Sequence, residues 1–146
     1  RGGPALSFVL DNSVTMRWFF GDGSPRDLAY AGRILDAMKS DEAVVPGLWG
    51  PEVANVLARA ESSGLVSEAR SETFIGMLHK LDLSVDAATP VHALGATLQL
   101  ARRHKLSTYD AAYLELALRA GLPLATLDEK LLKAARKAGV KRFAAA

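Results

Sequence analysis

Four acidic side chains stand at positions where the active site of an α/β protein is usually built. Two of them come directly after, or one residue after, short apolar runs that are expected to form strands. The other two fall in the first turns of expected helices. Ligands of parallel α/β sheets bind outside the carboxyl ends of the strands, so side chains from such positions can converge on one edge of a sheet. The four are Asp11, Glu52, Asp110 and Asp128.

Carboxylates that converge in this way need a counter-charge. Four of them within several ångströms would repel one another, and their pKa values would rise. A hard cation such as Mg²⁺ or Mn²⁺ removes that repulsion and prefers oxygen ligands. Two such ions, roughly 3.5–4 Å apart, can activate a water and stabilise the leaving oxygen of a phosphodiester. Each acid alone is better explained as a helix cap or a first-turn acid, so the prediction depends on the set.

Other metal chemistry is less well supported. The chain has no cysteine, which excludes thiolate zinc sites and disulfides. Its few histidines are His79, His92 and His104. We expect His104, in the basic run 102–105, to be a solvated residue at a helix end rather than a catalytic base.

Short apolar runs alternate with segments of helical periodicity, which predicts a parallel sheet covered by helices on both faces. Residues 51–80 hold no strand-like run, so two consecutive helices should form a hairpin there. The expected fold is therefore one domain, a three-layer α/β/α sandwich with a central, mainly parallel sheet and a helical hairpin insertion. Strands are expected at residues 6–10, 43–45, 83–85 and 122–126, with a last, weak one at 140–143.

Capping residues set the expected helix boundaries. Ser24 and Thr89 each precede a proline, so each places a capping hydroxyl before a proline at the first helical position. After Thr89, the apolar residues Leu94, Leu98 and Ala101 should share one face of a continuous helix. Helices are expected to stop at Gly64, Gly121 and Gly139.

Composition indicates a globular protein of the cytoplasm. Hydrophobic residues make up 49% of the chain, which argues against disorder. No apolar run approaches the roughly 20 residues needed to cross a bilayer, and no signal peptide is evident, so no membrane partner is expected. The absence of cysteine fits a reducing compartment. Residues 1–4 are set apart from the fold argument.

Four segments together resemble a known family, the PIN-domain ribonucleases, and within it the VapC-like toxins of bacterial toxin–antitoxin pairs. In order along the chain they are Phe8-Val9-Leu10-Asp11-Asn12-Ser13-Val14, Val45-Pro46-Gly47-Leu48-Trp49-Gly50-Pro51-Glu52-Val53-Ala54-Asn55, Leu106-Ser107-Thr108-Tyr109-Asp110-Ala111-Ala112-Tyr113-Leu114-Glu115-Leu116-Ala117 and Leu122-Pro123-Leu124-Ala125-Thr126-Leu127-Asp128. One such motif is weak evidence, whereas four in order at plausible spacing are strong. The resemblance runs from about residue 6 to residue 140.

The resemblance implies endonucleolytic cleavage of RNA with Mg²⁺ or Mn²⁺. It also implies a homodimer and a small cognate antitoxin whose C-terminal segment enters the acidic groove. The family's acids match Asp11, Glu52, Asp110 and Asp128 as catalytic and metal-binding residues. Its supporting polar positions match Ser13, Asn55 and Thr126.

Basic residues are candidates for binding RNA phosphates. Residues 99–146 hold ten Lys or Arg and four Asp or Glu, a net charge of +6, whereas residues 1–98 carry −4. Such a basic segment suits a polyanion, although solvated helix faces explain it equally well. The candidates are Arg59, which shares a helix edge with Glu52, and Lys130, Lys133, Arg136 and Lys137.

Two other functions stay open from the sequence. A metal nuclease acting on DNA needs the same acids, because the hydrolysed bond is also a phosphodiester. A non-catalytic module that binds RNA or a protein would have no need of four converging acids. Four aromatic residues allow a groove for an antitoxin or a dimer surface, but core packing is the favoured explanation for them. They are Trp18, Phe19, Phe20 and Trp49.

Overall fold

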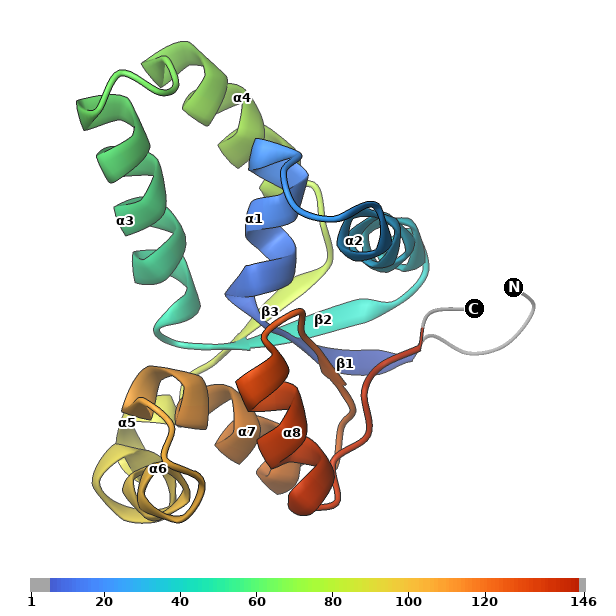
Figure 1. Ribbon diagram of the computed structural model, residues 1–146, viewed down its shortest axis with the longest axis vertical. Helices are drawn as coiled ribbons and strands as arrows, with labels where there is room; N and C mark the ends of the chain where they lie inside the picture. Colours follow the sequence, from blue (N-terminus) through green and yellow to red (C-terminus); the bar gives the residue numbers. More distant parts are fainter. Residues whose placement is uncertain (1–5, 145–146) are drawn as a thin grey trace.

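The computed structural model describes residues 6–144, and a four-stranded parallel sheet lies at its centre (Figure 1). The strand order is β3-β2-β1-β4, so the two strands that precede Asp11 and Asp128 are neighbours. This confirms the expected α/β fold with a parallel sheet. The strands are β1 (Ser7–Leu10), β2 (Glu42–Pro46), β3 (Leu83–Asp86) and β4 (Leu124–Ala125).

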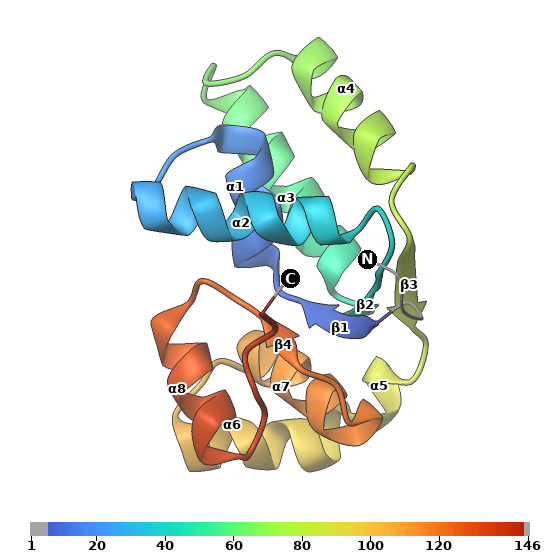
Figure 2. The same cartoon turned by 90° about the vertical axis from the view of Figure 1, so that its right-hand side faces the viewer.

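Helices cover both faces of the sheet, and the chain fills one face before the other. In Figures 1 and 2 the helices of the N-terminal half lie above the sheet and those of the C-terminal half lie below it. The first group is α1 (Asn12–Phe20), α2 (Pro25–Ala37), α3 (Trp49–Ser62) and α4 (Glu68–Leu78). The second is α5 (Thr89–His92), the π-helical turn η1 (Ala93–Thr97), α6 (Leu98–His104), α7 (Thr108–Ala120) and α8 (Glu129–Lys137). The helical hairpin predicted within residues 51–80 is confirmed as α3 and α4. Among the described helices, none combines the length and the hydropathy that a membrane span requires.

Serine hydroxyls begin three of these helices. Ser24, Ser67 and Ser107 each accept a hydrogen bond of 3.1 Å from the backbone N–H three residues on, which satisfies a donor that the first turn leaves free. The prediction for Ser24 is thus confirmed.

The prediction for Thr89 is wrong by one residue. Ala88 precedes α5, and Thr89 is its first residue. The Thr89 hydroxyl instead donates to Asp86 Oδ2 at 2.9 Å and accepts from the Gly47 N–H at 3.0 Å. It therefore ties the end of β3 to the turn after β2.

The continuous helix expected after Thr89 is interrupted. Gly95, within η1, has φ −112° and ψ −107°, which is not helical, so the segment before it is turned away from α6. Leu94 is 90% exposed, whereas Ala101 is buried. The apolar residues predicted to share a face therefore lie on differently oriented turns.

The strand predicted at residues 140–143 is also wrong. Only an isolated parallel bridge joins Leu124 to Arg142, because β4 has just two residues and offers little edge to pair with. Two backbone hydrogen bonds join this segment to Leu124, and side chains anchor it further. Phe143 stacks on Phe8 with ring centroids 4.2 Å apart, and its carbonyl accepts a hydrogen bond from the Tyr30 hydroxyl at 2.8 Å.

The core surrounds α7 and β1. Seven successive residues of α7, Ala111–Ala117, are buried, and so are Phe8, Val9 and Leu10. The four aromatic residues noted above pack into or against this core, as favoured from the sequence. The Trp18 indole N–H donates to Ala31 O, and that of Trp49 donates to Thr15 Oγ1, so both rings are fixed inside the upper layer.

Candidate active site

The register of β1 and β4 brings the first and last predicted segments together. Val9 pairs with Leu124 and Leu10 with Ala125, so the residues that follow the two strands lie next to each other. The Asp11 N–H continues the ladder by donating to Ala125 O at 3.0 Å. Asp11 and Thr126 therefore meet at one edge of the sheet although 115 positions separate them in sequence.

Asp11 is held by two hydroxyls. Ser13 Oγ donates to Asp11 Oδ2 at 2.6 Å, and Thr126 Oγ1 donates to the same oxygen at 2.8 Å. Each hydroxyl also accepts a backbone N–H at 3.0 Å, Ser13 from Leu127 and Thr126 from Asp128. These N–H groups orient the hydroxyl protons toward Asp11. Oδ1 receives no hydrogen bond from the described residues and is left for another ligand.

Burial governs the chemistry of Asp11. Only 4% of the residue is exposed, and this burial raises the pKa of the carboxyl to about 6, although the hydrogen bonds from Ser13 and Thr126 act in the opposite direction. Repulsion from Asp110 and Asp128 raises it further. Asp11 stands at the N-cap position of α1 but makes no side-chain capping bond. The alternative explanation as a helix cap therefore fails for this residue.

Glu52, in the first turn of α3, is positioned by a residue that the sequence did not single out. The hydroxyl of Tyr113, a fully buried residue of α7, donates to Glu52 Oε1 at 2.6 Å. Burial raises the pKa of Glu52, the Tyr113 bond lowers it, and the charges of Asp11 and Asp110 raise it again. Tyr113 lies one turn after Asp110, so the helix that carries one acid also orients another.

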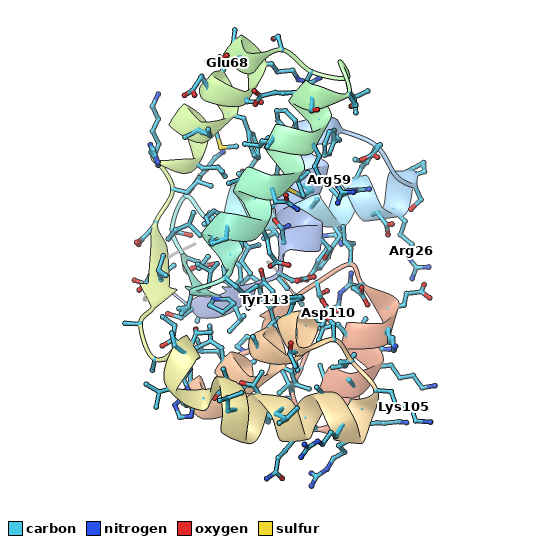
Figure 3. The ribbon with its side chains drawn as sticks, turned by 90° about the vertical axis from the view of Figure 1, so that its left-hand side faces the viewer. Arg26, Arg59, Glu68, Lys105, Asp110 and Tyr113 are labelled. Carbon is cyan, nitrogen blue, oxygen red and sulfur yellow. The ribbon has the colours of Figure 1, made fainter. Side chains whose placement is uncertain are left out.

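Asp110 lies in the first turn of α7, near the middle of the molecule (Figure 3). Its backbone N–H donates to Ser107 Oγ, which caps this helix. Burial raises the pKa of the half-buried carboxyl, and repulsion from Asp128 raises it further. Lys130 acts in the opposite direction and is therefore a nearby positive charge.

Asp128 combines two of the roles considered from the sequence. Its Oδ1 accepts the Leu131 N–H at 2.9 Å and so caps α8. The same charge contributes to the raised pKa values of Asp11 and Asp110. Asp128 is thus a structural cap that also belongs electrostatically to the group.

The four acids form one electrostatic cluster without a compensating ion pair. The charges of Asp110 and Asp128 raise the pKa of Asp11, and the charge of Asp128 raises that of Asp110. The charges of Asp11 and Asp110 in turn raise the pKa of Glu52. Within residues 6–144, no Lys, Arg or His lies within 4.0 Å of any of these carboxylates. Asp86 at the end of β3 differs, because Arg119 donates to both of its oxygens and lowers its pKa.

Oxygen donors whose charged forms repel are suited to a hard divalent cation. In the described part of the chain, however, no three His, Asp or Glu side chains already surround one point closely enough to hold an ion. The residues present thus fit such an ion by donor chemistry and charge. They do not form a finished coordination shell.

The remaining predicted residues separate into groups. Asn55 and Arg59 are exposed on α3, and Figure 3 shows Arg59 on the same side of the molecule as Asp110. On α8, Lys130, Lys133 and Lys137 line one hollow. Arg136 lines a different one, on the other side of the helix.

A family model for the PIN domain matches residues 8–137, which include all four acids. The chain belongs to the PIN-domain family. The fold agrees: the crystal structure of PAE2754 from Pyrobaculum aerophilum is similar to this chain with a TM-score of 0.64 and 22% sequence identity. That similarity covers 89% of this chain and 86% of the other. No curated protein matched the sequence.

Membership in the family sets a general expectation for this PIN domain. PIN domains are generally nucleases and usually use divalent metal ions. Two residues that orient acids here, Tyr113 and Ser107, lie within the segment that carries Asp110. A serine at a helix start, such as Ser107, is a local signal that a sequence displays. Nothing in the sequence linked Tyr113 to a glutamate 61 positions away.

Proposed function

We propose that this PIN domain is a metal-dependent endoribonuclease in which Asp11, Glu52, Asp110 and Asp128 hold Mg²⁺ or Mn²⁺. The observation that carries the proposal is the group of four carboxylates at one edge of the sheet, each of which interacts electrostatically with at least one of the others. Within residues 6–144, no ion pair neutralises any of them. A protein that only bound RNA would gain nothing from such a concentration of negative charge, because RNA is itself an anion.

Each residue has a distinct part in this proposal. Ser13 and Thr126 keep Asp11 in one rotamer, so that Oδ1 faces a ligand. Tyr113 holds Oε1 of Glu52 and leaves Oε2 available. A bound divalent ion would supply Lewis acidity and lower the pKa of a water. The carboxylates themselves position the ion and lose their mutual repulsion when it binds.

The test is a cleavage assay with unstructured RNA and DNA of the same sequence, with Mg²⁺, Mn²⁺ or chelator. We expect metal-dependent cleavage of RNA and much slower cleavage of DNA. Asp110→Asn should lower the rate at least about a hundredfold, because several kcal/mol of charge stabilisation depend on the ion, while RNA binding stays largely intact. The control is Asp36→Asn, an exposed acid that pairs with Lys39. Full activity of Asp110→Asn would refute the assignment, and faster cleavage of DNA would support the alternative substrate.

We further propose that the chain is the toxin of a toxin–antitoxin pair, acts in the cytoplasm as a homodimer and is inhibited by a small cognate protein. The support is the resemblance of its four motifs to VapC-like toxins. Expression of the wild type alone should arrest growth, and Asp110→Asn should not. Co-expression of the cognate partner should restore growth. A wild-type protein that cleaves RNA but leaves growth unaffected would contradict the toxin role and leave the nuclease proposal intact.

A further inference from the structure

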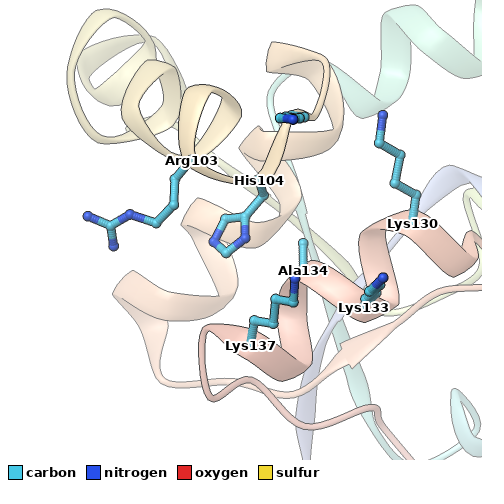
Figure 4. A pocket seen from close by; sticks show the side chains of 7 residues that line it. Arg103, His104, Lys130, Lys133, Ala134 and Lys137 are labelled. Atoms are coloured by element: carbon cyan, nitrogen blue, oxygen red, sulfur yellow. The ribbon is translucent and has the colours of Figure 1, made fainter.

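A basic groove lies between the end of α6 and one face of α8. It is a hollow of about 660 Å³ lined by Arg103, His104, Lys105, Lys130, Lys133, Ala134 and Lys137. Figure 4 shows the labelled side chains coming from the two elements on either side of it. No acidic residue lines this basic groove, and none of its Lys or Arg residues forms an ion pair within residues 6–144.

The basic groove begins beside the acidic cluster. Lys130, which lines it, lies close enough to Asp110 for its positive charge to lower the pKa of that carboxyl. Lys133 and Lys137 follow on the same face of α8, at spacings of three and four residues. At 1.5 Å per residue, Lys130 and Lys137 are about 10 Å apart along the helix axis, so they can reach different phosphates of one strand.

Lys105 provides a second, independent observation. It ends α6 in the left-handed conformation, with φ 55° and ψ 42°, and is the non-glycine residue with positive φ among those described. Glycine is favoured at such a helix end because a Cβ is strained there. Here the strained position carries a lysine whose side chain lines the basic groove.

We infer that the basic groove binds the phosphate backbone of a single-stranded RNA segment on one side of the scissile bond. The inference rests on the proposed function, which it deepens by naming where the substrate strand runs. Lys and Arg contacts to phosphates supply affinity without reading sequence. The basic groove therefore sets the length of RNA that the enzyme needs and leaves the choice of cut site to other contacts.

The other side of α8 offers a matched control. The hollow that contains Arg33 and Arg136 also holds Asp27 and Glu129, so its positive charge is partly balanced. Its Arg142 is already occupied, because the guanidinium lies 3.7 Å from the centre of the Tyr30 ring and donates to Thr126 O. Arg26 also lines this hollow, and removing Arg26 and Arg33 changes the net charge of the protein by the same amount as removing Lys133 and Lys137.

The experiment measures binding of a fluorescent oligouridylate in chelator, so that no cleavage occurs, over about 50 to 200 mM salt. Lys133→Ala with Lys137→Ala should reduce the slope of log K against log salt by about 1.4, since each phosphate contact to a single strand contributes about 0.7. Arg26→Ala with Arg33→Ala should leave the slope unchanged. The basic groove would be overturned as the binding path if both double variants reduced the slope equally, or if Lys133→Ala with Lys137→Ala left the slope unchanged.

Lys105→Gly separates binding from folding. This variant should bind the oligouridylate more weakly while its melting temperature stays the same or rises, because glycine relieves the left-handed strain. If Lys105→Gly binds the oligouridylate as tightly as the wild type, Lys105 does not contribute to RNA binding. Cleavage with Mn²⁺ is measured in parallel. Groove-dependent binding without any cleavage would refute the proposed function alone, whereas cleavage with an unchanged salt slope would refute the basic groove alone.

Discussion

The hydrogen bonds around the carboxylates decide which oxygen atoms remain for a ligand. Both hydroxyls that reach Asp11 contact Oδ2, the single bond to Glu52 reaches Oε1, and the cap of α8 occupies Oδ1 of Asp128. Each of these three acids thus has one oxygen fixed by the protein and another that no described residue hydrogen-bonds. Partners of this kind orient metal ligands and tune their affinity.

Tyr113→Phe tests this positioning at the scale of one atom. The variant removes the hydroxyl that donates to Glu52 and keeps the buried ring, so the fold should lose only about 1 kcal/mol. We expect the Mn²⁺ affinity to fall about 10- to 100-fold, the range found when a residue that orients a ligand is lost. The pKa of Glu52 should rise, because the Tyr113 bond lowers it in the wild type. The measurement is a metal titration with a parallel thermal melt, and unchanged metal affinity would make Tyr113 a purely structural residue.

The sequence located the acids but not the contacts among them. Asp11 and Asp86 both end strands and look alike in sequence, yet Asp11 has two hydroxyl partners and Asp86 has Arg119. These partners lie on distant segments, so only the packed fold distinguishes an unneutralised acid from an ion-paired one. For the same reason, the hydrogen bond from Tyr113 to Glu52 could not be predicted from the sequence. Nor could the division of the basic residues of α8 between two hollows.

At the scale of elements, helix starts place the chemistry. Asp110 is in the first turn of α7, Glu52 is in the first turn of α3 and Asp128 caps α8. Local signals such as serine caps and strand-ending acids made these starts visible in the sequence. The elements that were predicted wrongly from the sequence are those whose geometry depends on tertiary packing. They are the interrupted helix at Gly95 and the C-terminal segment, which side chains of β1 and α2 hold in place.

Ser107→Ala compared with Ser24→Ala tests whether a cap contributes to the site. Both serines accept the same 3.1 Å bond from the N–H three residues on, so each variant should cost about 1 kcal/mol of stability. Only Ser107 caps the helix that carries Asp110, and a hydrogen bond from the Ser107 side chain to the carboxylate lowers the pKa of that acid. Ser107→Ala should therefore raise the Mg²⁺ concentration needed for half-maximal cleavage, and Ser24→Ala should not. Equal metal requirements in the two variants would show that the start of α7 has no role in holding the ion.

At the scale of the whole molecule, the acidic cluster should make the metal-free protein less stable at neutral pH than in mild acid. The pKa of Asp11 is about 6 in the folded state and 3.8 when unperturbed, so the folded protein binds more protons than the unfolded chain between these values. The free energy of unfolding therefore falls as the pH rises through this window. At about 1.4 kcal/mol per pH unit, the loss from Asp11 reaches up to about 3 kcal/mol.

A melting series in chelator from pH 7 down to about 5 measures this effect before general acid unfolding begins. We expect wild-type stability to rise as the pH falls. In Asp11→Asn, the increase in stability with falling pH should be smaller, and the free energy of unfolding at pH 7 should exceed that of the wild type by about 1 kcal/mol. Excess Mg²⁺ or Mn²⁺ should stabilise the wild type more than the variant, because binding to the folded state adds to its stability. If Asp11→Asn is less stable than the wild type in chelator and metal shifts both equally, the role of Asp11 is structural.

Direct titration of Mn²⁺ into the metal-free protein at near-neutral pH tests the central claim that four carboxylates from separate segments hold a divalent ion. The proteins are the wild type, Asp11→Asn, Glu52→Gln, Asp110→Asn and Asp128→Asn, with Asp36→Asn as the control acid outside the cluster. We expect the wild type and the control to bind Mn²⁺ alike and each of the four variants to lose at least about tenfold in affinity. A wild type that binds no Mn²⁺, or four variants that bind it as tightly as the wild type, would contradict the central claim.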